Sequence, residues 1–137
     1  MNGKNHKIKK YRRYIIFFAI YILFIIITFM YAAIKRNQRQ QKYDKALYFM
    51  EIEEYQEAIS EFEQLGPYQN SFTLKAEAEM GLLYKDACDA FNNGEYEKAI
   101  SIFSQLEGYK DSNEKVLESK YNFALLYFDK KDYSKEM

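Results

Sequence analysis

Several residue types on which common protein chemistries depend are scarce in this chain. It has one cysteine, Cys88, so no disulfide can form within the chain and a cysteine-based metal site is excluded. Its one histidine, His6, lies in a basic N-terminal tail, so the rest of the chain cannot form a Ser-His-Asp triad or a His-Cys cluster. Five glycines and one proline include no glycine-rich phosphate loop. The sequence therefore predicts a protein that is not an enzyme, with no catalytic residue, no metal site and no cofactor.

Acidic residues are absent from the first part of the chain. Residues 1–42 hold ten Lys and Arg and no Asp or Glu, whereas residues 43–137 hold all 20 acidic residues and the other ten basic ones. The net charge of zero therefore divides into +10 followed by −10. Such asymmetry indicates two environments, and an acidic second part predicts a basic protein or peptide partner.

A run without charged residues, glycine or proline extends from Tyr14 to Ile34. As a helix, its 21 residues would be roughly 31 Å long, which matches the hydrocarbon core of a bilayer. Lys and Arg flank both ends, and Tyr11 and Tyr31 lie where interfacial aromatic residues are expected. We therefore predict a basic tail at 1–13, a single transmembrane helix at 14–34 and a polar helical stalk at 35–42.

A cleavable signal peptide is the competing interpretation of this run. Its apolar core should have about 7–15 residues and end in a small-x-small site. This run is longer, and Tyr31 is too large for such a site, so an uncleaved anchor in the cell membrane is preferred. Six Lys and Arg in residues 1–13 exceed the five in residues 35–45, which predicts a cytoplasmic N-terminus and an extracytoplasmic second part. The basic flanks are expected to contact lipid headgroups rather than nucleic acid.

One sequence motif occurs twice in the acidic part of the chain. Its apolar positions at i, i+3, i+4, i+7 and i+10 run from Tyr55 to Leu65 and recur from Tyr96 to Leu106, and a partial third copy begins at Tyr121. The copies are Tyr43, Ala46, Tyr55, Ala58, Ile59, Phe62 and Leu65; then Tyr84, Ala87, Gly94, Tyr96, Ala99, Ile100, Phe103 and Leu106; then Tyr121, Ala124 and Tyr133. The spacing is that of one helix face, and repetition at such a period indicates a stacked array of helices.

We expect this part to be helical throughout. Alternation typical of strands is absent, while Ala, Leu, Glu and Lys are plentiful. No helix breaker lies between Arg36 and Glu54, so the membrane helix is expected to continue into the first repeat helix. Outside the membrane run, most aromatic residues are expected to pack in the core, with Phe91 and Phe128 among them. The predicted helices are 43–52, 55–65, 71–92, 95–106, 111–130 and a further start at 133.

The turns between these helices are expected to share their chemistry. Glycine adopts the left-handed conformation that ends a helix at low cost, and Asn93-Gly94 provides it. The equivalent turns are placed at Glu53-Glu54 and Lys131-Asp132. Asp111 with Glu114 is expected to form a reciprocal cap on the last long helix, and Asn70 or Ser71 a simpler one.

The pattern Tyr-x-x-Ala, then Gly94-x-Tyr96-x-x-Ala99-Ile100-x-x-Phe103, resembles the tetratricopeptide repeat. The resemblance implies antiparallel helical hairpins that stack into a right-handed superhelix with a concave binding face. The periods of 41 and 37 exceed the usual 34 of that family. A Gly-Tyr-Lys-Asp-Ser loop replaces the usual closing proline, in the style of membrane-anchored repeat proteins of Gram-positive bacteria. The resemblance covers 43–137, with repeats at 43–70, 84–111 and 121–137 and a helical connection at 71–83.

The sequence thus predicts an all-α protein, in which one transmembrane helix precedes a TPR-like α-solenoid of about two and a half repeats. We expect a non-catalytic, membrane-anchored scaffold or adaptor that binds a protein or peptide through its acidic repeat surface. Two alternatives stay open: the anchor and docking arm of a larger membrane enzyme, and a structural membrane protein that self-associates. Self-association would use the unsatisfied apolar end of the array, formed by Phe123, Leu126, Tyr127 and Tyr133.

Overall fold

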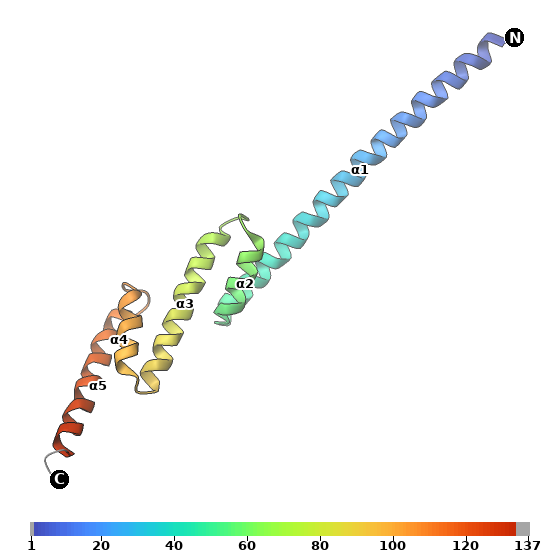
Figure 1. The fold of residues 1–137 in the computed structure, drawn as a ribbon. Helices are drawn as coiled ribbons and strands as arrows, with labels where there is room; N and C mark the ends of the chain where they lie inside the picture. Colours follow the sequence, from blue (N-terminus) through green and yellow to red (C-terminus); the bar gives the residue numbers. More distant parts are fainter. Residues whose placement is uncertain (1, 134–137) are drawn as a thin grey trace. The chain divides into compact units, whose positions relative to one another are not determined.

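The computed structural model describes residues 2–133, with side chains from residue 11 to residue 128. All regular secondary structure within that part is α-helical, as predicted (Figure 1). The helices are α1 (Asn2–Glu51), α2 (Tyr55–Leu65), α3 (Ser71–Asn92), α4 (Tyr96–Gln105) and α5 (Ser112–Tyr133). The chain divides into two compact units, residues 1–41 and 42–137, so that α1 belongs partly to each.

The helix boundaries follow the sequence closely, with one exception. Helices α2 and α3 begin and end at the predicted residues, and α4 differs by one residue at each end. The predicted turn at Lys131-Asp132 was wrong, because α5 is continuous as far as Tyr133. That pair holds no glycine, and an established helix extends at the gain of one hydrogen bond for each residue added. The expected helix start at 133 therefore fails as well.

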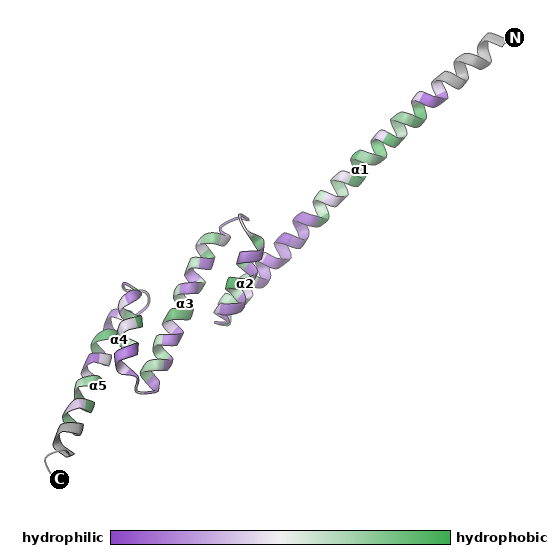
Figure 2. Cartoon of the chain, in the orientation of Figure 1, coloured by the Kyte–Doolittle hydropathy of each residue, from purple (hydrophilic) through white to green (hydrophobic). Residues whose placement is uncertain are grey.

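The first unit, residues 1–41, contains the apolar part of α1. One helix of the described residues is long and apolar enough to cross a membrane, and a signal sequence near the N-terminus can meet the same criterion. In Figure 2 a hydrophobic stretch of α1 is followed by a hydrophilic one, which includes the predicted stalk. Thr28, in the apolar stretch, donates its hydroxyl to the carbonyl of Ile25 at 2.8 Å, so its polar group needs no water.

The second unit is built of short helices that pack against their neighbours in the chain. α2 packs on α3, α3 on α4 and α4 on α5, with alternating directions (Figure 1). One core cluster joins the end of α1, α2 and the first half of α3, around Phe62. A second joins the second half of α3 with α4, around Phe103. Small side chains let these helices approach closely, and each of the following alanines is fully buried: Ala46, Ala58, Ala78, Ala87 and Ala99.

The turns recur in step with the helices. Left-handed residues occur at Glu53 (φ 59°) and, one repeat further along the chain, at Gly94 (φ 76°). The backbone bonds match as well, since the next residue donates its N–H to a carbonyl five residues earlier at 2.9 Å in both turns. The counterpart of Asn93-Gly94 is therefore Ile52-Glu53, one residue earlier than predicted. A non-glycine residue holds the conformation there because the same hydrogen bonds close the helix.

Candidate interaction surface

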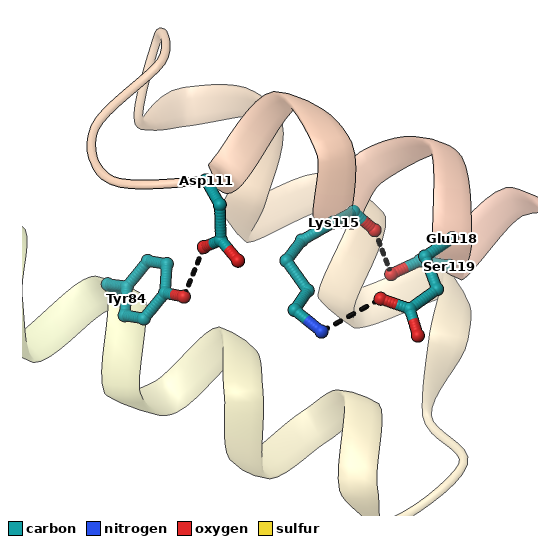
Figure 3. Close-up of polar contacts among 5 residues, drawn as sticks. All are labelled: Tyr84, Asp111, Lys115, Glu118 and Ser119. Carbon is teal, nitrogen blue, oxygen red and sulfur yellow. Dashed lines mark hydrogen bonds and ion pairs between the residues drawn. The ribbon is translucent and has the colours of Figure 1, made fainter.

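The end of α1 and α2 form a first helical hairpin, and α3 and α4 form a second. In each hairpin, a tyrosine hydroxyl donates a hydrogen bond to the residue that precedes the next helix. Tyr43 donates to Oδ1 of Asn70 at 2.5 Å, and Tyr84 donates to Oδ1 of Asp111 (Figure 3). The two pairs occupy positions one repeat apart, with Asp111 in the place of Asn70. The predicted cap by Asn70 was wrong, because Asn70 makes no side-chain cap bond, and the Asp111 carboxylate accepts from a tyrosine. These polar groups hold one hairpin against the start of the following helix.

Each of these tyrosines also lies edge-on to two further aromatic rings. Tyr43 meets Phe62 and Tyr68 with centroids 6.2 and 5.9 Å apart. The corresponding rings around Tyr84 are Phe103 and Tyr109, at 5.7 and 6.1 Å. Edge-to-face geometry is the favourable arrangement for such pairs. The rings of Tyr68 and Tyr109 are thus part of the packed aromatic cluster.

Tyr84 and Tyr109 have raised pKa values. Donation to the Asp111 carboxylate is the main reason that the pKa of Tyr84 lies well above its usual range, and burial adds to it. Burial raises the pKa of Tyr109, although the neighbouring Lys110 charge opposes this. Both hydroxyls are therefore protonated at neutral pH and available as donors.

Lys110 links the two hairpins. Its Nζ lies 3.6 Å from a carboxylate oxygen of Glu53, in the turn between α1 and α2. It also lies 4.8 Å from the ring centroid of Tyr84, 5.8 Å from that of Tyr109 and 5.9 Å from that of Tyr55. Burial lowers the pKa of Lys110, but the favourable interactions with Tyr55, Tyr109 and Glu53 outweigh it and raise the pKa overall. The lysine is therefore a charged bridge between consecutive repeats.

The first turns of α5 are fixed by a second lysine. Nζ of Lys115 lies 5.0 Å from the ring centroid of Phe91 in α3 and 2.8 Å from a carboxylate oxygen of Glu118. The Ser119 hydroxyl donates to the Lys115 carbonyl at 2.6 Å (Figure 3). The hydrogen bond to Glu118 is the main reason that the pKa of Lys115 is raised, against the opposing effect of burial. α5 is thereby held to α3 as well as to α4.

The structure places the three copies of the repeat motif differently. In the first copy, Tyr43, Ala46, Tyr55, Ala58, Ile59, Phe62 and Leu65 are all buried. In the second, Ala87, Ala99, Phe103 and Leu106 are buried, Tyr84, Tyr96 and Ile100 are half-buried, and Gly94 lies in an exposed turn. In the third, Tyr121 and Ala124 are exposed, and the side chain of Tyr133 lies outside the described residues.

Much of the third copy is an exposed apolar face on α5. Phe128 was expected to pack in the core, but its side chain is 74% exposed. Leu126 and Tyr127 are exposed, as predicted for an apolar end of the array, whereas Phe123 is half-buried. The position of Phe128 in the repeat predicts a core residue, but no helix of the described residues packs on this part of α5.

Groups that could hold a metal ion do not come together in the described part of the chain. No cluster of three or more His, Cys, Asp or Glu occurs there. Asp86 and Asp89, one turn apart on α3, are not enclosed by other acidic groups, and Asp86 is exposed to solvent. Cys88 is a free thiol, half-buried against the second core cluster. These residues are placed as surface charge and as packing, respectively.

Comparison with protein-family models, with curated proteins and with solved structures finds no match to this chain. Its copies can still be compared with one another. A shift of one repeat relates the contacts of Tyr43 to those of Tyr84, one by one, as well as their positions in the sequence. The repeat is thus a unit of three-dimensional packing.

Proposed function

We propose that this chain is a membrane-anchored, non-catalytic interaction module, whose TPR-like helical repeat binds a protein or peptide partner. The observation that carries the proposal is the recurrence of the whole contact set of Tyr43 around Tyr84. Units that repeat their packing build an extended surface without a single closed pocket, and such surfaces suit polypeptide ligands. The similarity to the tetratricopeptide repeat supports the same function.

The apolar part of α1 provides the anchor in this proposal. Residues 14–34 would cross the cell membrane once, with the basic residues of 1–13 on the cytoplasmic side and residues 43–137 outside. Lys and Arg at both ends of the run would bind lipid headgroups. The membrane would then hold the repeat at a fixed location, where it recruits its partner.

Charge determines the kind of partner that fits best. Residues 43–137 carry a net charge of −10, and α2, α3 and α4 expose acidic residues such as Glu57, Glu79 and Glu97. An acidic surface speeds and strengthens association with a basic segment. Added salt screens this attraction and weakens the binding. We therefore propose a partner with a basic segment, and no nucleic acid.

The test is photocrosslinking of the full chain in its own membrane. A photoreactive amino acid replaces Glu79 or Glu97, both exposed, and adducts are resolved by mass. We expect one discrete polypeptide adduct, whose yield falls as the salt concentration of isolated membranes rises. The matched control carries Phe103→Ala, which removes a fully buried ring and should abolish the adduct by unfolding the second hairpin.

Two results would argue against the proposal. The first is an absence of any adduct from several exposed positions on α2, α3 and α4, at low salt and in intact cells. The second is an adduct that survives the unfolding of both hairpins, because the repeat would then not be its binding surface. An adduct that is indifferent to salt would refute the basic character of the partner.

A further inference from the structure

Three tyrosine rings from different parts of the chain lie around one ammonium group. Tyr55 begins α2, Tyr84 lies in α3 and Tyr109 follows α4. The Nζ of Lys110 lies 5.9, 4.8 and 5.8 Å from their respective ring centroids, and 3.6 Å from a carboxylate oxygen of Glu53. Aromatic faces recognise cations in proteins, and a nearby carboxylate adds to the attraction. We call the three rings together with Glu53 the aromatic cage.

The cage favours a positive charge more strongly than burial disfavours it. Burial lowers the pKa of Lys110, yet the interactions with Tyr55, Tyr109 and Glu53 raise it overall. Burial is the largest reason that the pKa of Tyr109 is raised, and the negative charges of Glu77 and Glu53 add to it. Two carboxylates thus act on the rings, and a cation is stabilised among them.

Neither the turn nor the aromatic packing requires an ammonium group in the cage. Gln69 stands in the place of Lys110 in the first hairpin, and the two residues share a left-handed backbone, with φ of 49° and 52°. The rings of Tyr43 and Tyr68 meet edge-on there, as those of the second hairpin do. The side chain of Lys110 is 39% exposed, so the cage opens to solvent at the lysine.

We infer that the aromatic cage is a binding site for one basic side chain of the partner, and that Lys110 occupies it until the partner binds. This inference rests on the proposed function and names the residues that receive the basic segment. The exchange replaces one cation by another, so the charge within the cage stays the same. Arginine is the better occupant, because its planar guanidinium is more weakly hydrated than an ammonium and stacks on aromatic faces.

A fixed bridge and an exchangeable occupant predict different behaviour. If Lys110 only joined the hairpins, its removal would weaken the array and leave the binding of cations unchanged. If it occupies a binding site, its removal makes the cage available and strengthens the binding of an arginine. The general attraction of the acidic surface does not distinguish Lys110 from any other lysine of residues 43–137, whereas the cage does.

The test is a titration of the full chain, in nanodiscs of zwitterionic lipid, with a tri-arginine peptide. NMR of labelled tyrosine rings and of the peptide follows the binding. Lys110→Ala removes the ammonium and keeps the Cβ, so the left-handed residue is equally strained before and after the change. We expect it to bind the peptide about fivefold more tightly than the native chain, with shifts at Tyr55, Tyr84 and Tyr109 and ring-current shifts in the peptide. Glu53→Gln, added to Lys110→Ala, should remove most of this gain.

The matched control is Lys98→Ala, which removes an equal charge from an exposed ion pair with Glu95. It should change the affinity for the peptide by less than about twofold. Equal gains from Lys98→Ala and Lys110→Ala would reduce the effect to net charge and overturn the inference. No gain from Lys110→Ala would overturn it too, provided that hydrogen exchange shows both hairpins folded. If that variant unfolds, Lys110→Gln repeats the titration with the residue of the first hairpin.

The photocrosslinking experiment separates the two proposals. Lys110→Ala should raise the yield of the salt-sensitive adduct, because the partner no longer competes with the lysine. A salt-sensitive adduct whose yield Lys110→Ala leaves unchanged would support the general function and refute the aromatic cage as its site.

Discussion

The two hairpins contain the same cluster of aromatic rings around Tyr43 and Tyr84, but the polar residues around the two clusters differ. Asn70 accepts from Tyr43, whereas the charged Asp111 accepts from Tyr84. Gln69 stands in the first hairpin where the second has Lys110. The buried serines differ too. The hydroxyl of Ser71 donates to the carbonyl of Tyr68, while that of Ser112 has no partner within the part of the chain that the structure describes.

The turns show which of these features determine the hairpin. Glu53 adopts the left-handed conformation that glycine adopts at 94, although a side chain there is less favourable by about 1–2 kcal/mol. At the other end, Glu107 is left-handed in the place of Gly66. The apolar contacts are the constant part of both hairpins, and the turn residues are the variable part. We conclude that side-chain burial sets the geometry and the turns conform to it.

The largest effect is expected from removing the central phenylalanine of either hairpin. Phe62→Ala and Phe103→Ala should each lower the free energy of unfolding by about 3–5 kcal/mol, because each leaves a cavity in a closed core. Hydrogen exchange of the full chain in micelles, read on peptides from α2 and α4, measures the two separately. Phe72→Ala, on the exposed surface, should change either value by less than about 0.5 kcal/mol. If the loss were below about 1 kcal/mol in only one hairpin, the two phenylalanines would not contribute equally to the stability of their hairpins.

Gly81→Ala tests a close contact between α3 and Tyr55 of the first hairpin, for which α5 has no matching glycine. A Cβ at this position would lie 2.5 Å from Cε1 of the Tyr55 ring. Overpacking of this kind costs about 1–3 kcal/mol, against about 1 kcal/mol of helix propensity gained, so we expect a net loss of stability. Asn122 on α5, which lies 41 residues after Gly81 as Ser112 lies 41 residues after Ser71, is the control, because Asn122→Ala should gain a few tenths of a kcal/mol.

The reason for the loss can be checked with a double mutant. If the contact with the ring is responsible, Gly81→Ala should cost nothing when Tyr55 is already Ala, and the two changes will be strongly non-additive. Additive losses in α3 exchange would show that the strain lies elsewhere in the helix.

Asp111→Asn gives the second hairpin the polar pair of the first, and the effect should appear at alkaline pH. The raised pKa of Tyr84 means that the folded state holds this proton more tightly. The resulting stabilisation is complete below the ordinary pKa of 10.0 and is lost as the pH rises from there towards the raised value. Asp111→Asn should lower the pKa of Tyr84 and flatten this alkaline loss. Unfolding at several pH values measures it, with Tyr84→Phe as the reference that lacks the group. An unchanged alkaline slope in Asp111→Asn would exclude the carboxylate as the cause.

The helices were predictable because their causes are local. Period-3.6 apolar positions and the spacing of the repeat located α2 and α3 to the residue, and the burial of Ala46, Ala87 and Ala99 follows from the same pattern. The turn at Lys131-Asp132 was predicted by analogy with the earlier copies. The structure instead continues α5 through this pair as far as Tyr133.

The partners of polar side chains were less predictable. Asp111 had a good capping sequence, yet its carboxylate bonds to Tyr84, far earlier in the chain. The repeat held a usable signal, since Tyr43 and Asn70 share that separation. Nothing in the sequence indicated the bridge from Lys110 to Glu53, because the first hairpin has Gln69 in that place and offers no copy to compare.

Lys110→Gln gives the second hairpin the residue of the first and should have the smallest effect. An exposed ion pair contributes about 0–1 kcal/mol, and a cation over an exposed ring about 0.5–1 kcal/mol. We expect a loss of under about 1 kcal/mol that shrinks in high salt, because screening weakens the pair with Glu53. The control is Lys98→Gln, since Lys98 pairs at 3.0 Å with Glu95 of its own repeat. A double-mutant cycle with Glu53→Gln isolates the bridge. If Lys110 couples the hairpins, its loss will speed exchange in the turn at Glu53 as well as in α5, and an effect confined to α5 would leave the hairpins joined by apolar contacts alone.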